Sequence, residues 1–211
     1  MSLDSKNSTG YTNLGTALMM SGDFPQAIAA FNQALEIGPH RTTYSNLGLQ
    51  YYYLHRYEEA VSAHQEAVRM APDNHLVWAN LGDALYFEEG QGSATSAFAK
   101  AEELVDQRLS VNPNDPSVLL GAAWIKTMLG KPNEANELIA IAVDIAPSDP
   151  YLIYMRALIN LRQDRTSEAL ADLEKAVAMG YSVKIIAAEP YLESLRNELR
   201  FKALLKSSEK N

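Results

Sequence analysis

The sequence predicts an all-α fold: a helical-repeat α-solenoid of five helix–turn–helix pairs, closed by a helical C-terminal cap. The first observation is a repeat, because residue types in 44–72 recur on both sides at offsets of about 34 residues. The second is composition, since 47% apolar and 21% charged residues suit a chain that folds around a core. The third is the order of small and large positions. Small residues let two helices approach and large ones fill the gap, so stacked repeats supply the core that one repeat lacks.

One set of positions carries the repeat signal. In residues 44–72 these positions hold Tyr44, Leu47, Gly48, Tyr51, Ala60, Ala67 and Pro72. The pattern resembles the tetratricopeptide repeat (TPR) family, in which W-x2-L-G-x2-Y is followed by A-x3-F and then P. The resemblance implies a right-handed superhelix. It also implies that nearly all of these residues are architecture.

The first three repeats fill the family positions better than the last two. Gly22 marks the first turn, whereas His55 stands at the equivalent place in the second repeat. In the third, the glycines are displaced and the next proline comes late, which predicts one long helix over about 93–112. The expected repeat bounds are 9–40, 41–74, 75–115, 116–149 and 150–180.

Several residues depart from the pattern. His64 takes a large apolar position in the second repeat, and Lys126 takes another in the fourth. The Lys126 stem is expected to pack while its ammonium reaches water. The fifth repeat departs at Arg156, Asn160 and Asp164, as expected of an end repeat that meets water.

The two ends of the chain are expected to differ from the repeats. Residues 1–8 are polar and predict a disordered arm or an expression remnant, and 207–211 predict a disordered tail. Residues 181–206 predict capping helices near 183–188, 190–196 and 198–206. The run Leu195-Arg196-Asn197-Glu198-Leu199-Arg200-Phe201 resembles an end module that follows repeat arrays in bacterial signalling proteins.

Charge and composition narrow the function. A net charge of −8 argues against nucleic-acid partners, which need a basic patch, and no apolar run approaches the length for membrane insertion. There is no Cys, and the four His lack metal-ligand spacing, so no metal site is predicted. Nucleophile, phosphate-loop and cofactor motifs are also missing, so neither catalytic residues nor a cofactor is predicted and the chain is not expected to be an enzyme. Cytoplasmic residence is expected, with the periplasm left open.

A partner groove is implied by the resemblance, because the first helix of each family repeat lines the concave side. The positions mapped to that side lack the cationic set that clamps a peptide carboxylate. They are rich in aromatics, which are common binding anchors. The predicted partner-groove residues are Tyr52, Tyr53, Asp83, Tyr86, Phe87, Trp124 and Tyr154.

Core packing is the competing interpretation of these aromatics. A contact role is favoured for Tyr53, Tyr86 and Phe87 as a set, and core packing for Trp124. Tyr51 is taken as scaffold, with Tyr52 and Tyr53 pointing to the other side.

The predicted function is a protein–protein interaction scaffold or adaptor that binds a partner peptide or helix in this groove. The alternative is the regulatory or sensor repeat region of a larger bacterial signalling protein, such as a kinase, nucleotide cyclase or transcriptional regulator. The partner's identity and the oligomeric state are left open.

Overall fold

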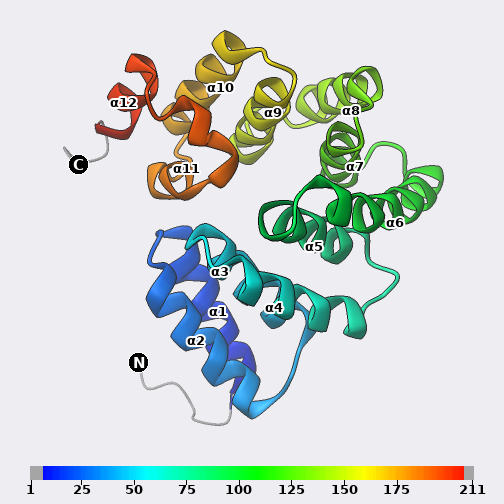
Figure 1. The fold of residues 1–211 in the computed structure, drawn as a ribbon, viewed down its shortest axis with the longest axis vertical. Helices are drawn as coiled ribbons and strands as arrows, with labels where there is room; N and C mark the ends of the chain where they lie inside the picture. Colours follow the sequence, from blue (N-terminus) through cyan, green and yellow to red (C-terminus); the bar gives the residue numbers. More distant parts are fainter. Residues whose placement is uncertain (1–6, 207–211) are drawn as a thin grey trace. The chain divides into compact units, whose positions relative to one another are not determined.

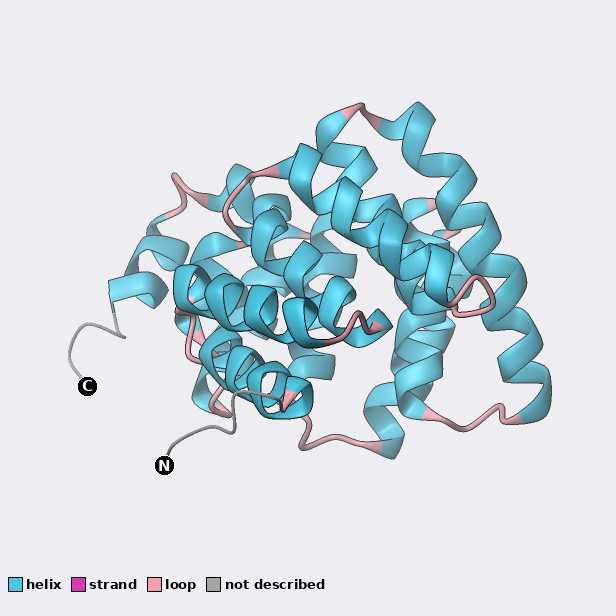
Figure 2. Ribbon diagram, turned by 90° about the horizontal axis from the view of Figure 1, so that it is seen from below, coloured by secondary structure: helices cyan, strands magenta, loops and turns pink. Residues whose placement is uncertain are grey.

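The structure is a computed structural model that describes residues 7–206. Within that range the chain consists of helices and short connections, with no strand (Figures 1 and 2). The predicted disordered ends, 1–8 and 207–211, lie outside the described residues except for Asn7 and Ser8, and Ser8 begins the first helix.

Ten helices form five consecutive pairs. They are α1 (Ser8–Met20) and α2 (Phe24–Ile37), α3 (Arg41–Tyr53) and α4 (Tyr57–Met70), α5 (His75–Glu88) and α6 (Gln91–Val111), α7 (Pro116–Met128) and α8 (Pro132–Ile145), and α9 (Pro150–Arg162) and α10 (Thr166–Ala178). The tail adds α11 (Val183–Ala188), the 3₁₀ helix η1 (Pro190–Leu195) and α12 (Leu199–Lys206). The all-α solenoid is confirmed, as are the long helix α6 and the three tail helices.

The chain divides into two compact units, residues 1–101 and 102–211, and the division falls within α6. The first unit holds α1 to α5 and the start of α6. The second holds the end of α6 and all later helices.

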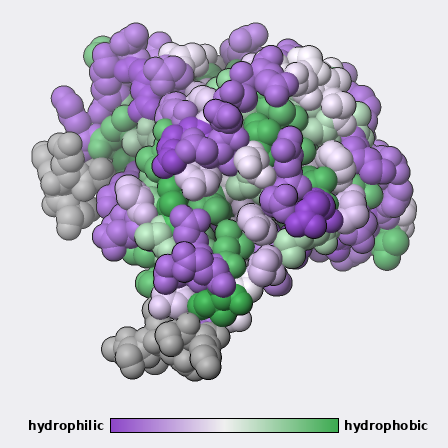
Figure 3. Space-filling view, turned by 60° about the horizontal axis from the view of Figure 1, so that its bottom comes forward, coloured by the Kyte–Doolittle hydropathy of each residue, from purple (hydrophilic) through white to green (hydrophobic). Residues whose placement is uncertain are grey.

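On the face drawn in Figure 3, hydrophobic residues lie in patches among hydrophilic ones.

The turns inside the pairs need left-handed backbone. Gly22 and Gly130 adopt φ of 73° and 71°, which glycine reaches without steric cost. His55 and Asp164 adopt φ of 58° and 59° at the equivalent turns, so the repeat imposes the conformation even where glycine is missing. The His55 ring is held there by a 2.8 Å hydrogen bond between its Nδ1 and the Tyr57 hydroxyl.

Helix starts follow ordinary capping chemistry. The side chains of Asp23, Asn74, Asp115 and Asp149 accept backbone N–H groups in the first turns of α2, α5, α7 and α9. Pro116 and Pro150 occupy first helical positions, where a missing N–H costs nothing.

The first unit is built on a glycine facing a ring. A Cβ on Gly15 would lie 2.5 Å from the Phe31 ring, and one on Gly82 would lie 2.9 Å from that of Phe98. Such distances are too short, so both rings fill space that only glycine leaves. In the second repeat His64 fills this place against Gly48, with an exposed fraction of 1%.

Lys126 in the second unit corrects a prediction. Its side chain does not reach water: the residue is 7% exposed, and Nζ lies 2.9 Å from Glu102, 3.3 Å from Asp106 and 3.2 Å from Glu134. Burial alone would lower the pKa of Lys126, but hydrogen bonds to Glu102 and Glu134 and the nearby Asp106 charge outweigh it and raise the pKa. Three carboxylates therefore replace the solvent.

Two of the departures in the fifth repeat, Arg156 and Asn160, belong to a polar network. Arg156 Nε and Asn160 Nδ2 each donate to Asp172 Oδ2 at 2.9 Å. Arg165 Nε donates to Asn160 Oδ1 at 3.0 Å. Polar residues are tolerated at these inward positions because they satisfy one another.

The tail covers the last pair. Ile186, Leu192 and Phe201 are fully buried, one from each tail helix. Arg200 on α12 pairs with Glu174 on α10 at 3.0 and 2.9 Å.

Candidate functional site

The predicted groove residues of the first unit separate by burial. Tyr52 and Tyr53 are 4% and 9% exposed. The Tyr53 ring stacks on Phe24 at 5.3 Å between centroids, and the Tyr52 ring meets Phe87 edge-on at 5.6 Å. Both rings of Tyr52 and Tyr53 therefore lie in the interior, as the core-packing interpretation expects.

Asp83, Tyr86 and Phe87 are only half-buried. They are spaced i, i+3 and i+4 on α5, which places them on one side of the helix. The Tyr86 and Phe87 rings meet at 5.2 Å and 82°, and Phe87 also stacks on Tyr57 at 5.2 Å and 18°. We call Asp83, Tyr86 and Phe87 the α5 aromatic face, and it is the part of the predicted groove that keeps accessible surface.

Trp124 and Tyr154 pack inside the second unit. Trp124 is 5% exposed, and its ring centroid lies 5.0 Å from that of Tyr191 in η1. Tyr154 is 1% exposed, stacks on Tyr181 at 4.4 Å and donates its hydroxyl to Glu189 at 2.7 Å. These two residues hold the tail against α7 and α9, which again fits core packing.

Polar side chains on the first helices of the first three pairs bond to one another. Side-chain hydrogen bonds join the first helices of successive pairs: Thr12 with Thr43 at 2.9 Å, Asn46 with Thr16 at 3.3 Å, and Asn80 with Ser45 at 3.0 Å. This ladder fixes the spacing of α1, α3 and α5.

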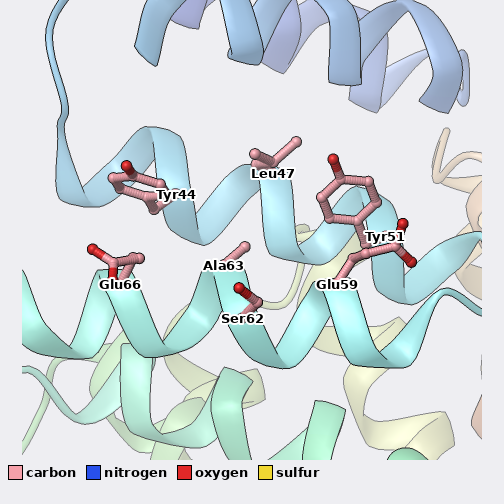
Figure 4. A pocket seen from close by; sticks show the side chains of 7 residues that line it. All are labelled: Tyr44, Leu47, Tyr51, Glu59, Ser62, Ala63 and Glu66. Carbon is pink, nitrogen blue, oxygen red and sulfur yellow. The ribbon is translucent and has the colours of Figure 1, made fainter. Parts of the chain in front are cut away.

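A trough between α3 and α4 was not predicted from the sequence (Figure 4). Its volume is about 240 Å³ and its lining is mainly apolar. We call it the α3–α4 trough; it is lined by Tyr44, Leu47 and Tyr51 of α3 and by Glu59, Ser62, Ala63 and Glu66 of α4. Tyr44 and Tyr51 had been assigned to architecture alone, yet both are only half-buried.

Each end of the α3–α4 trough carries a tyrosine, a glutamate and an arginine. At one end Arg56 Nε donates to Glu59 at 3.0 Å, and the guanidinium carbon lies 4.6 Å from the centre of the Tyr51 ring. The hydrogen bond from Arg56 lowers the pKa of the Glu59 carboxyl.

The other end carries a second arginine–glutamate pair. Arg69 Nε and Nη2 donate to Glu66 Oε2 at 3.0 and 2.6 Å. The pKa of Arg69 is raised by the hydrogen bond to Glu66 and by the Glu66 charge, with a contribution from Tyr44. The sequence signal for both ends is a seven-residue spacing, from Tyr44 to Tyr51 and from Glu59 to Glu66.

Among residues 7–206, no group of three or more His, Asp or Glu is disposed to hold a metal ion. None of the helices described is both long and apolar enough to span a bilayer.

Comparison with known proteins identifies the repeats. Residues 7–73 and 45–108 each match a family model described as tetratricopeptide repeat. Human protein O-mannosyl-transferase TMTC3 is 23% identical over 185 residues, which cover 81% of this chain and 20% of that protein. The chain spans 18–20% of the length of the curated relatives that it matches.

Solved structures share the fold. The crystal structure of a thermophilic TPR protein from Thermus thermophilus matches with a TM-score of 0.62 and 19% identity, covering 97% of this chain and 100% of that one. The APC/C hetero-tetramer Cut9-Hcn1 matches with a TM-score of 0.57 and 17% identity, covering 97% of this chain and 36% of that one. Residues 7–108 therefore match tetratricopeptide-repeat models, and the likeness in fold extends along the chain.

Proposed function

We propose that this chain is a protein-interaction scaffold that binds a peptide or helix of a partner protein, without catalysing a reaction. Proteins of the tetratricopeptide repeat fold are generally scaffolds of this kind, and the family models match residues 7–108. The Cut9-Hcn1 neighbour is itself part of a protein assembly.

The observation that carries the contact surface is the α5 aromatic face. Of the seven predicted groove residues, Tyr52, Tyr53, Trp124 and Tyr154 are buried, so their rings cannot meet a partner without repacking. Asp83, Tyr86 and Phe87 keep accessible surface on one side of one helix. Tyrosine and phenylalanine offer stiff, large contact area, and the Asp83 carboxylate offers an acceptor for a donor on the partner.

The test is a pull-down by the full chain with quantitative mass spectrometry, followed by a binding titration with the purified partner. Tyr86→Ala and Asp83→Asn are expected to weaken binding of that partner by about tenfold or more, as truncated anchors do. Glu88→Gln, an exposed position on the same helix, serves as the control and is expected to leave binding unchanged.

Circular dichroism and thermal unfolding separate contact from stability. Unchanged affinity in both α5 variants, with native helicity retained, would refute the α5 assignment. Loss of helicity in Tyr86→Ala would show that its ring belongs to the core.

A second candidate function is the repeat region of a larger signalling protein. It is favoured by the relatives' length, since this chain corresponds to 18–20% of each. The resemblance of the tail to a bacterial end module agrees with it. Sequencing the transcript around this segment decides the matter: an open reading frame that extends into a catalytic or DNA-binding domain supports it, and flanking stop codons refute it.

A further inference from the structure

We infer that the α3–α4 trough is a second protein-binding site, and that it receives a basic amphipathic helix of a partner protein. The occupant has arginines at positions i and i+7 and an apolar side chain between them. This site shares no residue with the α5 aromatic face.

At both ends of the α3–α4 trough, an arginine of the chain itself occupies the place that we assign to an arginine of the partner. At one end the Arg56 guanidinium lies 4.6 Å from the centre of the Tyr51 ring and donates to Glu59, and at the other end the Arg69 guanidinium donates to Glu66. A guanidinium both stacks on an aromatic ring and forms charge-assisted hydrogen bonds to a carboxylate. The two ends are therefore built for arginine rather than for an anion.

The internal arginines are displaceable. The Arg56 and Glu59 side chains are 47% and 46% exposed, and those of Arg69 and Glu66 are 70% and 40% exposed. Ion pairs this exposed are weakly stabilising because water and salt screen them. A partner arginine can therefore replace Arg56 while Arg56 turns into solvent.

The middle of the α3–α4 trough suits an apolar side chain. Leu47 and Ala63 are 5% and 7% exposed and lie between the two charged ends (Figure 4). A partner side chain that fills the trough, whose volume is about 240 Å³, buries its own apolar surface, a hydrophobic contribution that the internal arginines do not supply.

The spacing selects a helix as the occupant. Tyr44 and Tyr51, like Glu59 and Glu66, are seven residues apart, which is about 10 Å along a helix at 1.5 Å per residue. A partner helix parallel to α3 and α4 presents arginines at i and i+7 with the same separation, and its i+3 residue falls between them. The net charge of −8 attracts such a basic segment over longer range.

The experiment uses fluorescent helical peptides and the full chain, with binding followed by anisotropy. The probe peptide has Arg at i and i+7 and Leu at i+3 in an alanine–glutamine background. In one control peptide both Arg residues are replaced by Gln, and in a second control peptide both are replaced by Glu. The wild-type chain is expected to bind the Arg peptide at least about tenfold more tightly than either control, as cation–π contacts and charge-assisted hydrogen bonds require.

Matched variants locate the site. Glu59→Gln is expected to weaken binding about fivefold, while its neighbour Glu58→Gln, which makes the same charge change outside the trough, stays within about twofold. Arg56→Ala is expected to tighten binding a few-fold because the internal competitor is gone, an effect that a purely structural role for Arg56 does not produce. Tyr86→Ala on α5 should not alter the affinity for the Arg peptide, which distinguishes this site from the α5 aromatic face.

Three results would overturn the inference. They are preference for the Glu peptide, equal weakening by Glu58→Gln and Glu59→Gln, and lack of Arg-peptide binding by a wild-type chain of native helicity.

Discussion

His64 makes the stability of the second repeat depend on pH. The residue occupies the place that Phe31 and Phe98 fill in the neighbouring repeats, facing Gly48 where they face Gly15 and Gly82. It is 1% exposed, and its Nδ1 has no hydrogen-bond partner. Burial lowers the pKa of His64 from 6.5 to about 3, because the charged imidazolium would lose its hydration.

The sign and size follow from proton linkage. The unfolded chain takes up a proton on His64 below about pH 6.5, whereas the folded chain resists it until about pH 3. The stability that the neutral, buried His64 side chain contributes is therefore fully present above about pH 6.5, and it is lost as the pH falls toward 3. Relative to pH 8, the free energy of unfolding is expected to fall by about 2 kcal/mol at pH 5 and by about 3 kcal/mol at pH 4 from this residue alone.

The assay is urea unfolding followed by circular dichroism, for the wild type and for His64→Phe, between pH 8 and pH 4. Phenylalanine already fits the equivalent place against Gly15 and Gly82, so His64→Phe is expected to fold. Its advantage over the wild type should grow by about 2 kcal/mol between pH 8 and pH 5. The reciprocal change Phe98→His should add a second acid-sensitive position. A stability difference between His64→Phe and the wild type that is the same at every pH would refute the reasoning.

Two other variants test the packing. Gly48→Ala places a Cβ 2.6 Å from the buried imidazole opposite and is expected to cost about 1–3 kcal/mol by urea unfolding, whereas Gly38→Ala meets nothing within 4 Å and should be nearly neutral. Tyr154→Phe removes the hydroxyl that donates to the 3% exposed Glu189 and is expected to cost about 1.5–3 kcal/mol. Tyr151→Phe, at a residue that is 47% exposed, should change the melting temperature much less, and equal effects of the two would contradict the buried pairing.

The fold could be predicted because the same packing pattern occurs in several repeats of the sequence. A glycine facing a ring recurs with the same spacing, so each copy supports the others. Even the His55 turn follows the register, adopting the left-handed backbone of Gly22 without being glycine. The surroundings of Lys126 could not be predicted from the sequence, because the carboxylates around its ammonium come from two other helices, α6 and α8, and depend on how these pack against α7.

The site was harder to predict, because a helical position does not say whether a neighbour covers it. The three consecutive tyrosines of α3 show the difficulty. Successive residues point about 100° apart around a helix, so Tyr51, Tyr52 and Tyr53 face three directions. The sequence assigned Tyr51 to the scaffold and the other two to a partner. The structure buries Tyr52 and Tyr53, and it packs the half-exposed Tyr51 against the core cluster of Ala27, Phe31 and Leu47 beside the α3–α4 trough.

The burial of Tyr52 and Tyr53 has a physical cause that bears on both proposed surfaces. Tyr52 and Tyr53 are drawn inward because Phe24 and Phe87 offer them aromatic partners. That packing fixes the rotation of α3 about its axis, which leaves Tyr51 lining the α3–α4 trough and against the cluster of Ala27, Phe31 and Leu47. The aromatic contacts that support Phe87 on α5 therefore also set the geometry of the trough. The two surfaces share an underlying core but no lining residue, so exposed substitutions should abolish one interaction at a time, while a change at Tyr52 should impair both.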